Sequence, residues 1–252
     1  MTERRLRSDS ARTEPIAALQ ALRASTADLV RGLSARQWSD DEIHAASLCD
    51  GWTRAHVLSH LARNADGIAA TLSGALRGEI VQRYPDGWDA RDADIEGGST
   101  RPTTEIAADV VASADRLDRV LAAVAEANAW DAPTDQNLVA GDWPPRRLLE
   151  VEIHRVDLAG EYTPDRWPPL LVADLLPVVA ATLPKRVQGA VRVRIDTEGS
   201  IVPDHPTTEW TAGEGEPTEV RGPDWAILAW LVGRPTVVEA ALTAAPALAP
   251  WG

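Results

Sequence analysis

The sequence predicts an α+β protein, in which an N-terminal four-helix bundle is followed by a small α/β domain. Two observations carry this prediction. Apolar residues recur with helical periodicity in four segments before Gly160, whereas the residues after Pro168 contain short segments with the alternating pattern of strands. A Pro-rich stretch, "GEYTPDRWPP", lies between these two parts and indicates an interdomain linker.

The four helical segments share an apolar spacing close to 3.6 residues. They run from Pro15 to Leu33, from Thr53 to Gly78, from Thr103 or Thr104 to Ala127, and from Pro144 to Gly160. Pro15 suits the first turn of a helix, and Thr53 is a suitable N-cap. Four helices joined by one or two long crossovers are typical of a helix bundle, and no repeat of fixed period indicates a solenoid.

Two segments of the N-terminal part lack this periodicity. Residues 1–14 are charged and no apolar stretch follows them, which predicts a disordered leader rather than a secretory signal. Residues 81–102, "VQRYPDGWDARDADIEGGSTRP", are polar and rich in turn formers, so a long loop is expected there. The predicted domains are therefore residues 15–163 and residues 168–252.

The C-terminal part mixes helical and strand patterns. A helix is expected in "LVADLLPVVAATLPKR", and "AVRVRIDT" alternates valine and isoleucine with arginine, as a half-buried strand does. Further strands are expected in "TTEWTAG" and "PTEVRG", and "DWAILAWLVGR" indicates an apolar helix that ends at Gly233. Neither part contains a glycine-rich phosphate loop, so a nucleotide-binding motif is not predicted.

Composition excludes several classes of function. The net charge of −13 makes the chain a poor partner for nucleic acid, and no apolar run is long enough to span a membrane. Cys49 is the only cysteine, so no internal disulfide can form. With no targeting segment, a cytoplasmic location is expected. Lys185 is the only lysine, and this preference for arginine is typical of a GC-rich coding bias, as in actinobacteria.

A candidate metal site comes from two of the predicted helices. Glu150 and His154 are four residues apart on an otherwise apolar helix, so they share one face. His56 and His60 have the same spacing on the second helix, where His60 lies on the apolar face and His56 lies nearer the N-cap. Because bundles build metal sites from inward side chains of facing helices, His60, Glu150 and His154 are the predicted ligands. Three protein ligands leave one position open, as in catalytic zinc sites.

A purely structural alternative remains open for the same helix. Glu150 could form a solvated pair with Arg146 or Arg147, a contact that stabilises a helix by only a few tenths of a kcal/mol. Glu152 and Arg155 are expected to form an ordinary exposed pair. The apolar neighbours of Glu150 favour a buried position, however, and a buried carboxylate needs a partner or a metal.

The segments "GWTRAHVLSHLARNADGI", "LLEVEIHRVDLAGEY" and "WLVGR" together resemble the mycothiol-dependent maleylpyruvate isomerase family, within the DinB-like metalloenzymes. The resemblance covers nearly the whole chain. It implies a DinB-like, metal-binding four-helix domain and a small α/β C-terminal domain. It places the metal ligands at His60, Glu150 and His154, and a functional arginine at Arg234. Arg221 is the other arginine available there, and Arg234 could also simply complement a helix C-terminus.

The resemblance implies zinc, or another divalent metal, and mycothiol as the thiol cofactor. The thiolate would add to the cis double bond of maleylpyruvate, the resulting single bond would rotate, and loss of the thiol would give fumarylpyruvate, a step of gentisate degradation. An arginine suits the carboxylates of such a substrate, and Arg83, Arg91 and Arg101 are weaker candidates than Arg234. Cys49 is expected to be a small buried residue rather than the nucleophile.

Three other functions fit parts of this pattern. A mycothiol S-transferase acting on electrophiles would use the same metal and thiol without the rotation. A metal-dependent hydrolase would need a general base, for which Glu152 or Asp157 would have to face the metal. A non-enzymatic helical binding module would leave Glu150 and His154 to satisfy each other. The expected partners are a small-molecule substrate and mycothiol, and the sequence does not define an oligomeric state.

Overall fold

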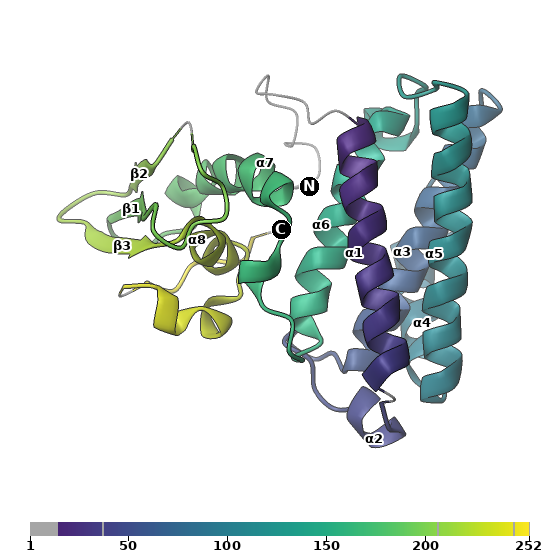
Figure 1. Ribbon diagram of the computed structural model, residues 1–252, viewed down its shortest axis with the longest axis horizontal. Helices are drawn as coiled ribbons and strands as arrows, with labels where there is room; N and C mark the ends of the chain where they lie inside the picture. Colours follow the sequence, from purple (N-terminus) through teal and green to yellow (C-terminus); the bar gives the residue numbers. More distant parts are fainter. Residues whose placement is uncertain (1–14, 37, 206, 244, 252) are drawn as a thin grey trace. The chain divides into compact units, whose positions relative to one another are not determined.

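The protein was analysed as a computed structural model that describes residues 15–36, 38–205, 207–243 and 245–251 (Figure 1). The disordered leader expected over residues 1–14 lies outside the described residues. The chain divides after Glu161 into two compact units, and the second unit begins at Tyr162.

Four long helices form the first unit. They are α1 (Pro15–Arg36), α3 (Arg54–Leu76), α5 (Thr103–Glu126) and α6 (Trp143–Asp157). These helices run alongside one another (Figure 1), and α1 and α3 each pack against both α5 and α6. This closed set of neighbours is a four-helix bundle, as the periodicity predicted. A short helix, α2 (Asp40–Ile43), lies in the connection between α1 and α3.

The start of α3 is capped as the sequence predicted. The hydroxyl oxygen of Thr53 accepts a hydrogen bond from the backbone N–H of His56, and the backbone N–H of Thr53 donates to Nδ1 of His56 at 3.2 Å. Both residues thus satisfy donors that a helix N-terminus leaves without partners. His56 therefore belongs to the cap, and Nε2 of its ring lies 3.1 Å from both Oε2 of Glu96 and Oγ of Ser99.

The prediction of a long loop over residues 81–102 is wrong in part. Trp88–Ser99 form a further helix, α4, which packs against α3. Ile95 is its only buried large apolar residue, so the helix has almost no apolar periodicity. Its contact with α3 depends on small side chains instead. A Cβ on Gly98 would lie 2.8 Å from Oγ of Ser59, which shows how closely the two helices approach.

The chain between α3 and α4 lies directly on α3. A Cβ added to Gly67 would be 2.7 Å from Cγ of Arg83 and 2.9 Å from its carbonyl oxygen. The hydroxyl of Thr71 also donates to the carbonyl of Val81 at 3.1 Å. Gly67 is therefore needed for the close approach that holds Arg83 and Tyr84 beside α4.

The second unit contains two helices and a three-stranded sheet. Its elements are α7 (Pro169–Ala180), β1 (Val191–Ile195), β2 (Glu209–Ala212), β3 (Thr218–Gly222) and α8 (Asp224–Leu231). The strand order is β2-β1-β3, with β1 antiparallel to β2 and parallel to β3. Helix α8 packs against α7, β1 and β3.

The alternation in β1 explains how the sheet is oriented. Val191, Val193 and Ile195 are buried, whereas Arg192 and Arg194 are exposed and pair with Glu209 of β2. One face of the sheet thus joins the core and the other is charged, as the period of two predicted. Within the described ranges, no helix is both long enough and apolar enough to cross a membrane.

Candidate metal centre

Three potential metal ligands meet between two adjacent helices of the bundle. His60 comes from α3, and Glu150 and His154 come from α6. Oε2 of Glu150 lies 2.9 Å from Nε2 of His60 and 3.5 Å from Nε2 of His154. The two imidazole rings meet edge to face, with centroids 4.7 Å apart. The structure therefore brings together all three residues that the sequence predicted as ligands.

The donor set fits a divalent metal such as zinc. One ligand atom from each residue lies within 4.8 Å of the other two. Ligand atoms around a tetrahedral zinc are roughly 3.3 Å apart, given metal–ligand bonds of about 2.0 to 2.1 Å. The distances of 2.9 and 3.5 Å bracket that separation. Two imidazoles and one carboxylate also leave a coordination position for an external ligand.

The protonation of His60 and Glu150 suits them for metal binding. Burial lowers the pKa of His60 from 6.5 to about 4, although the hydrogen bond to Glu150 and its charge oppose this shift. Burial by itself would raise the pKa of Glu150, but hydrogen bonds from His154 and His60 outweigh it and hold that pKa well below 4.5. At neutral pH, His60 is therefore neutral and Glu150 is ionised.

His154 differs from His60 because it has two carboxylate neighbours. Burial disfavours its charged form, yet the hydrogen bond to Asp157, with further contributions from Cys49 and Glu150, raises the pKa of His154 well above 6.5. In this network His154 is therefore protonated at neutral pH. A metal that binds Nε2 must displace a proton from that nitrogen, so metal binding is linked to pH.

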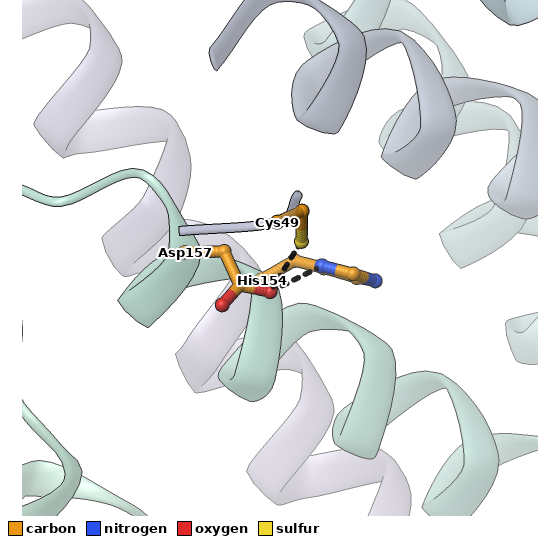
Figure 2. Close-up of side chains that lie close together, drawn as sticks. All are labelled: Cys49, His154 and Asp157. Carbon is orange, nitrogen blue, oxygen red and sulfur yellow. Dashed lines mark hydrogen bonds and ion pairs between the residues drawn. The ribbon is translucent and has the colours of Figure 1, made fainter. Parts of the chain in front are cut away.

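Asp157 supports His154 from the side opposite Glu150. Oδ2 of Asp157 accepts hydrogen bonds from Nδ1 of His154 at 2.8 Å and from Sγ of Cys49 at 3.1 Å. Figure 2 shows both side chains meeting at this carboxylate. Asp157 is fully buried, and its backbone carbonyl accepts from the N–H of Leu48 at 2.9 Å. A carboxylate on Nδ1 keeps the proton there and presents Nε2 as the metal-binding nitrogen.

Cys49, His154 and Asp157 form a second group whose atoms are close enough to hold a metal. This group would use Nδ1 of His154, whereas the group with His60 and Glu150 uses Nε2. A neutral imidazole keeps one of its two nitrogens protonated, so His154 cannot serve both groups in that form. The distances around Asp157 are those of hydrogen bonds, and we therefore describe this second group as support for His154.

Arg91 is a further residue at the centre. Its Nη2 lies 2.6 Å from Nδ1 of His60, although the sequence placed Arg91 in a loop as a weak candidate. Arg91 also lines a cleft of about 280 Å3, together with Arg63, Arg83 and Tyr84. Only the folding of residues 88–99 into α4 brings Arg91 to His60.

Comparisons with known proteins now identify the family. Residues 19–159 match the family model of the mycothiol maleylpyruvate isomerase N-terminal domain, which is more than half of the chain. The chain belongs to the mycothiol-dependent maleylpyruvate isomerase family. A comparison with curated proteins found no match.

Solved structures support the same fold. The chain is similar to the crystal structures of the mycothiol-dependent maleylpyruvate isomerase and of a histidine-to-alanine mutant of that enzyme. Each has a TM-score of 0.79 and 24% sequence identity, over 95% of this chain and 98% of the other. At this identity the likeness shows that the chain has the isomerase fold across both units.

Within this isomerase fold, the prediction that Glu152 and Arg155 form an exposed pair is wrong in part. It pairs with Arg155 at 3.0 Å, as expected, but its side chain is fully buried rather than exposed. Helix α6 packs against both α1 and α3, so little of its circumference faces solvent. Arg147 is also buried and donates to Oδ1 of Asn64 at 2.9 Å, while Glu150 turns toward the two histidines.

The arginines proposed for the family's substrate contacts lie in different places. Arg234 belongs to the second unit and donates from Nη1 to the carbonyl of Val232, just beyond the end of α8. This contact is the one expected of a cation at a helix C-terminus, and a role in the reaction stays a prediction. Arg221 pairs with Asp196 on the surface of the sheet, and Arg101 pairs with Asp109 in the first unit.

Replacing Asp157 with asparagine is expected to weaken zinc binding by about 10- to 100-fold, the usual effect of losing a carboxylate behind a ligating histidine. The substitution preserves the size of the buried side chain but removes the charge that supports His154. Competition with a chromophoric chelator measures the zinc affinity. Cys49→Ala is the matched control, because it removes the other donor to Asp157 and is expected to change the affinity less. Equal zinc affinity of Asp157→Asn and the unmodified protein would contradict this role.

Proposed function

We propose that this chain is a mycothiol-dependent cis–trans isomerase that converts maleylpyruvate, or a related unsaturated keto acid, to the trans isomer. The convergence of His60, Glu150 and His154 in a member of this family is the observation that carries the proposal. A divalent metal held by these residues would lower the pKa of a coordinated thiol and so supply a thiolate at neutral pH.

The residues of the centre have distinct parts in this proposal. Neutral His60 and ionised Glu150 would each give the metal a lone pair, and Asp157 orients the ring of His154 through Nδ1. Cys49 does not supply the nucleophile, because its thiol donates to Asp157 on the far side of the His154 ring. Since Cys49 is the only cysteine of the chain, the thiolate of the proposed reaction has to come from an external thiol cofactor.

The substrate also needs positive charge, since the addition of a thiolate to the unsaturated keto acid develops negative charge on the carbonyl oxygen. We propose Arg234 for this contact, with Arg221 as the other candidate of the second unit. An arginine binds a carboxylate through two parallel hydrogen bonds, which fixes the substrate as well as neutralising it.

Turnover of maleylpyruvate tests the proposal directly. The protein is purified without chelator, its metal content is determined by elemental analysis, and loss of the cis isomer is followed with and without added mycothiol. We expect isomerisation that requires both mycothiol and the bound metal, and that stops after chelation and returns with added zinc. No isomerisation under these conditions overturns the proposal. Accumulation of a stable mycothiol conjugate without isomerisation would assign the chain to the S-transferases instead.

A further inference from the structure

We infer that Arg91 competes with the metal for His60, and that metal binding releases its guanidinium into the adjacent cleft, where it binds a carboxylate of the substrate. The first half of this inference concerns the metal site, and the second half rests on the proposed function. The contact between Nη2 of Arg91 and Nδ1 of His60, at 2.6 Å, is the observation from which both halves start.

The direction of this contact follows from the chemistry of the two groups. A guanidinium can only donate hydrogen bonds, so Nδ1 of His60 must accept. The proton of the neutral ring is then on Nε2, where it donates to Oε2 of Glu150 at 2.9 Å. Each of the two contacts of the His60 ring thus joins a donor to an acceptor.

Metal binding through Nε2 reverses that arrangement. The lone pair must then be on Nε2 and the proton on Nδ1, which would place an N–H group of His60 against an N–H group of Arg91. Two donors cannot remain 2.6 Å apart, so the guanidinium has to leave. His154 shows the contrast, because its Nδ1 faces the carboxylate of Asp157, so the Nδ1–H group keeps an acceptor when a metal displaces the proton on Nε2.

The cleft beside α4 is where the released guanidinium can go. Arg91 itself lines this cleft of about 280 Å3, and Arg63, Arg83 and Tyr84 are among the other lining residues. Nη1 of Arg91 pairs with the exposed Asp92, whereas Nε is buried and has no hydrogen-bond partner among the described residues. A carboxylate in the cleft would satisfy the fork of donors that leaves His60. Asp94 also lines the cleft and is the internal group that could compete for this arginine.

Zinc affinity tests the first half without any measurement of activity. Metal-stripped full-length protein is titrated with zinc against a chromophoric chelator. We expect Arg91→Met to bind zinc at least about fivefold more tightly than the unmodified protein, because the competing charged hydrogen bond is lost. Arg91→Gln is expected to bind zinc at least as tightly as Arg91→Met, since its carbonyl can accept from Nδ1–H. Arg63→Met is the control, because Arg63 lines the same cleft and pairs with Asp66 and Asp109 rather than with His60.

Unchanged or weaker zinc binding by both Arg91 variants, with circular dichroism showing that they fold, would overturn the inference that Arg91 competes with the metal.

The inference that Arg91 binds a carboxylate of the substrate is tested by calorimetry with succinate, a dicarboxylate that cannot isomerise. Zinc-loaded unmodified protein is expected to bind succinate about tenfold more tightly than zinc-loaded Arg91→Met. Equal succinate affinities would mean that the carboxylate contacts another group and would overturn this half. Neither measurement uses turnover, so the two proposals can fail separately. If the Arg91 variants bind zinc more tightly but the unmodified protein has no isomerase activity, the competition by Arg91 is supported and the proposed function is overturned.

Discussion

Replacing Glu150 with alanine is expected to remove bound zinc almost completely and to reduce mycothiol-dependent turnover by more than about 100-fold. Glu150 is the only anionic member of the ligand set, and its Oε2 lies between the two imidazoles at 2.9 and 3.5 Å. Its removal leaves two imidazoles and no negative charge, and His154 holds a proton that the metal must displace. His60→Ala and His154→Ala should have the same effect, since each leaves only two ligands.

The fold should survive these substitutions, because the ligands are not part of the apolar core of the bundle. Elemental analysis of each variant, with thermal unfolding measured in parallel, separates metal loss from misfolding. His56→Ala is the matched control, as it removes a histidine one turn from His60. It should keep its zinc while losing about 1 kcal/mol of stability through the weakened helix cap. Full zinc content in all three ligand variants would show that the metal binds elsewhere.

The second large effect is expected from Asp224→Ala, which should destabilise the second unit by about 3 to 5 kcal/mol. Asp224 begins α8 and is fully buried. Its Oδ1 accepts from the backbone N–H groups of Ile201 and Trp225, at 3.0 and 2.7 Å. Its Oδ2 accepts from the N–H of Val202 at 2.8 Å and from Nε2 of His205 at 2.9 Å. Alanine would leave all four donors without this carboxylate, and each unsatisfied buried donor costs about 1 to 3 kcal/mol, although such costs are not additive.

Chemical denaturation of the full chain, followed by the fluorescence of its tryptophans, measures this effect. Asp204→Ala is the control, because Asp204 is an exposed aspartate in the segment that Asp224 holds. Asp224→Asn retains one carbonyl oxygen and should be intermediate between the control and Asp224→Ala. An Asp224→Ala variant with the same denaturation midpoint as the control would show that these hydrogen bonds contribute little.

Periodicity was a sufficient guide wherever an element buries one continuous apolar face. The four bundle helices and the strand of Val191, Val193 and Ile195 are of this kind, and the structure has them close to where the sequence predicted. Helix α4 was not predicted, because it is held against α3 by Gly98 and other small residues that leave no apolar stripe in the sequence. Its existence depends on the surface that α3 presents to it.

The features of the candidate site also differ in whether local spacing could predict them. The spacing of Glu150 and His154 on one helix, and the position of His60 on the apolar face of another, are local properties, and they were enough to predict the three residues that meet. Asp157 is three residues from His154, so the same spacing argument could have indicated it, but its burial and its contact with Cys49 could not be derived locally.

The sequence by itself therefore determined the bundle, the alternating strand and the identities of the three converging side chains, because local periodicity encodes which face of each element is buried. Only the tertiary structure decided that Arg91 faces Nδ1 of His60, that Asp157 is buried against Cys49 and that Glu152 is buried. The physical reason is that these properties depend on how closely separate helices approach one another. Small residues such as Gly98 and Gly67 permit that approach, and their effect is visible only once the neighbouring segment is in place.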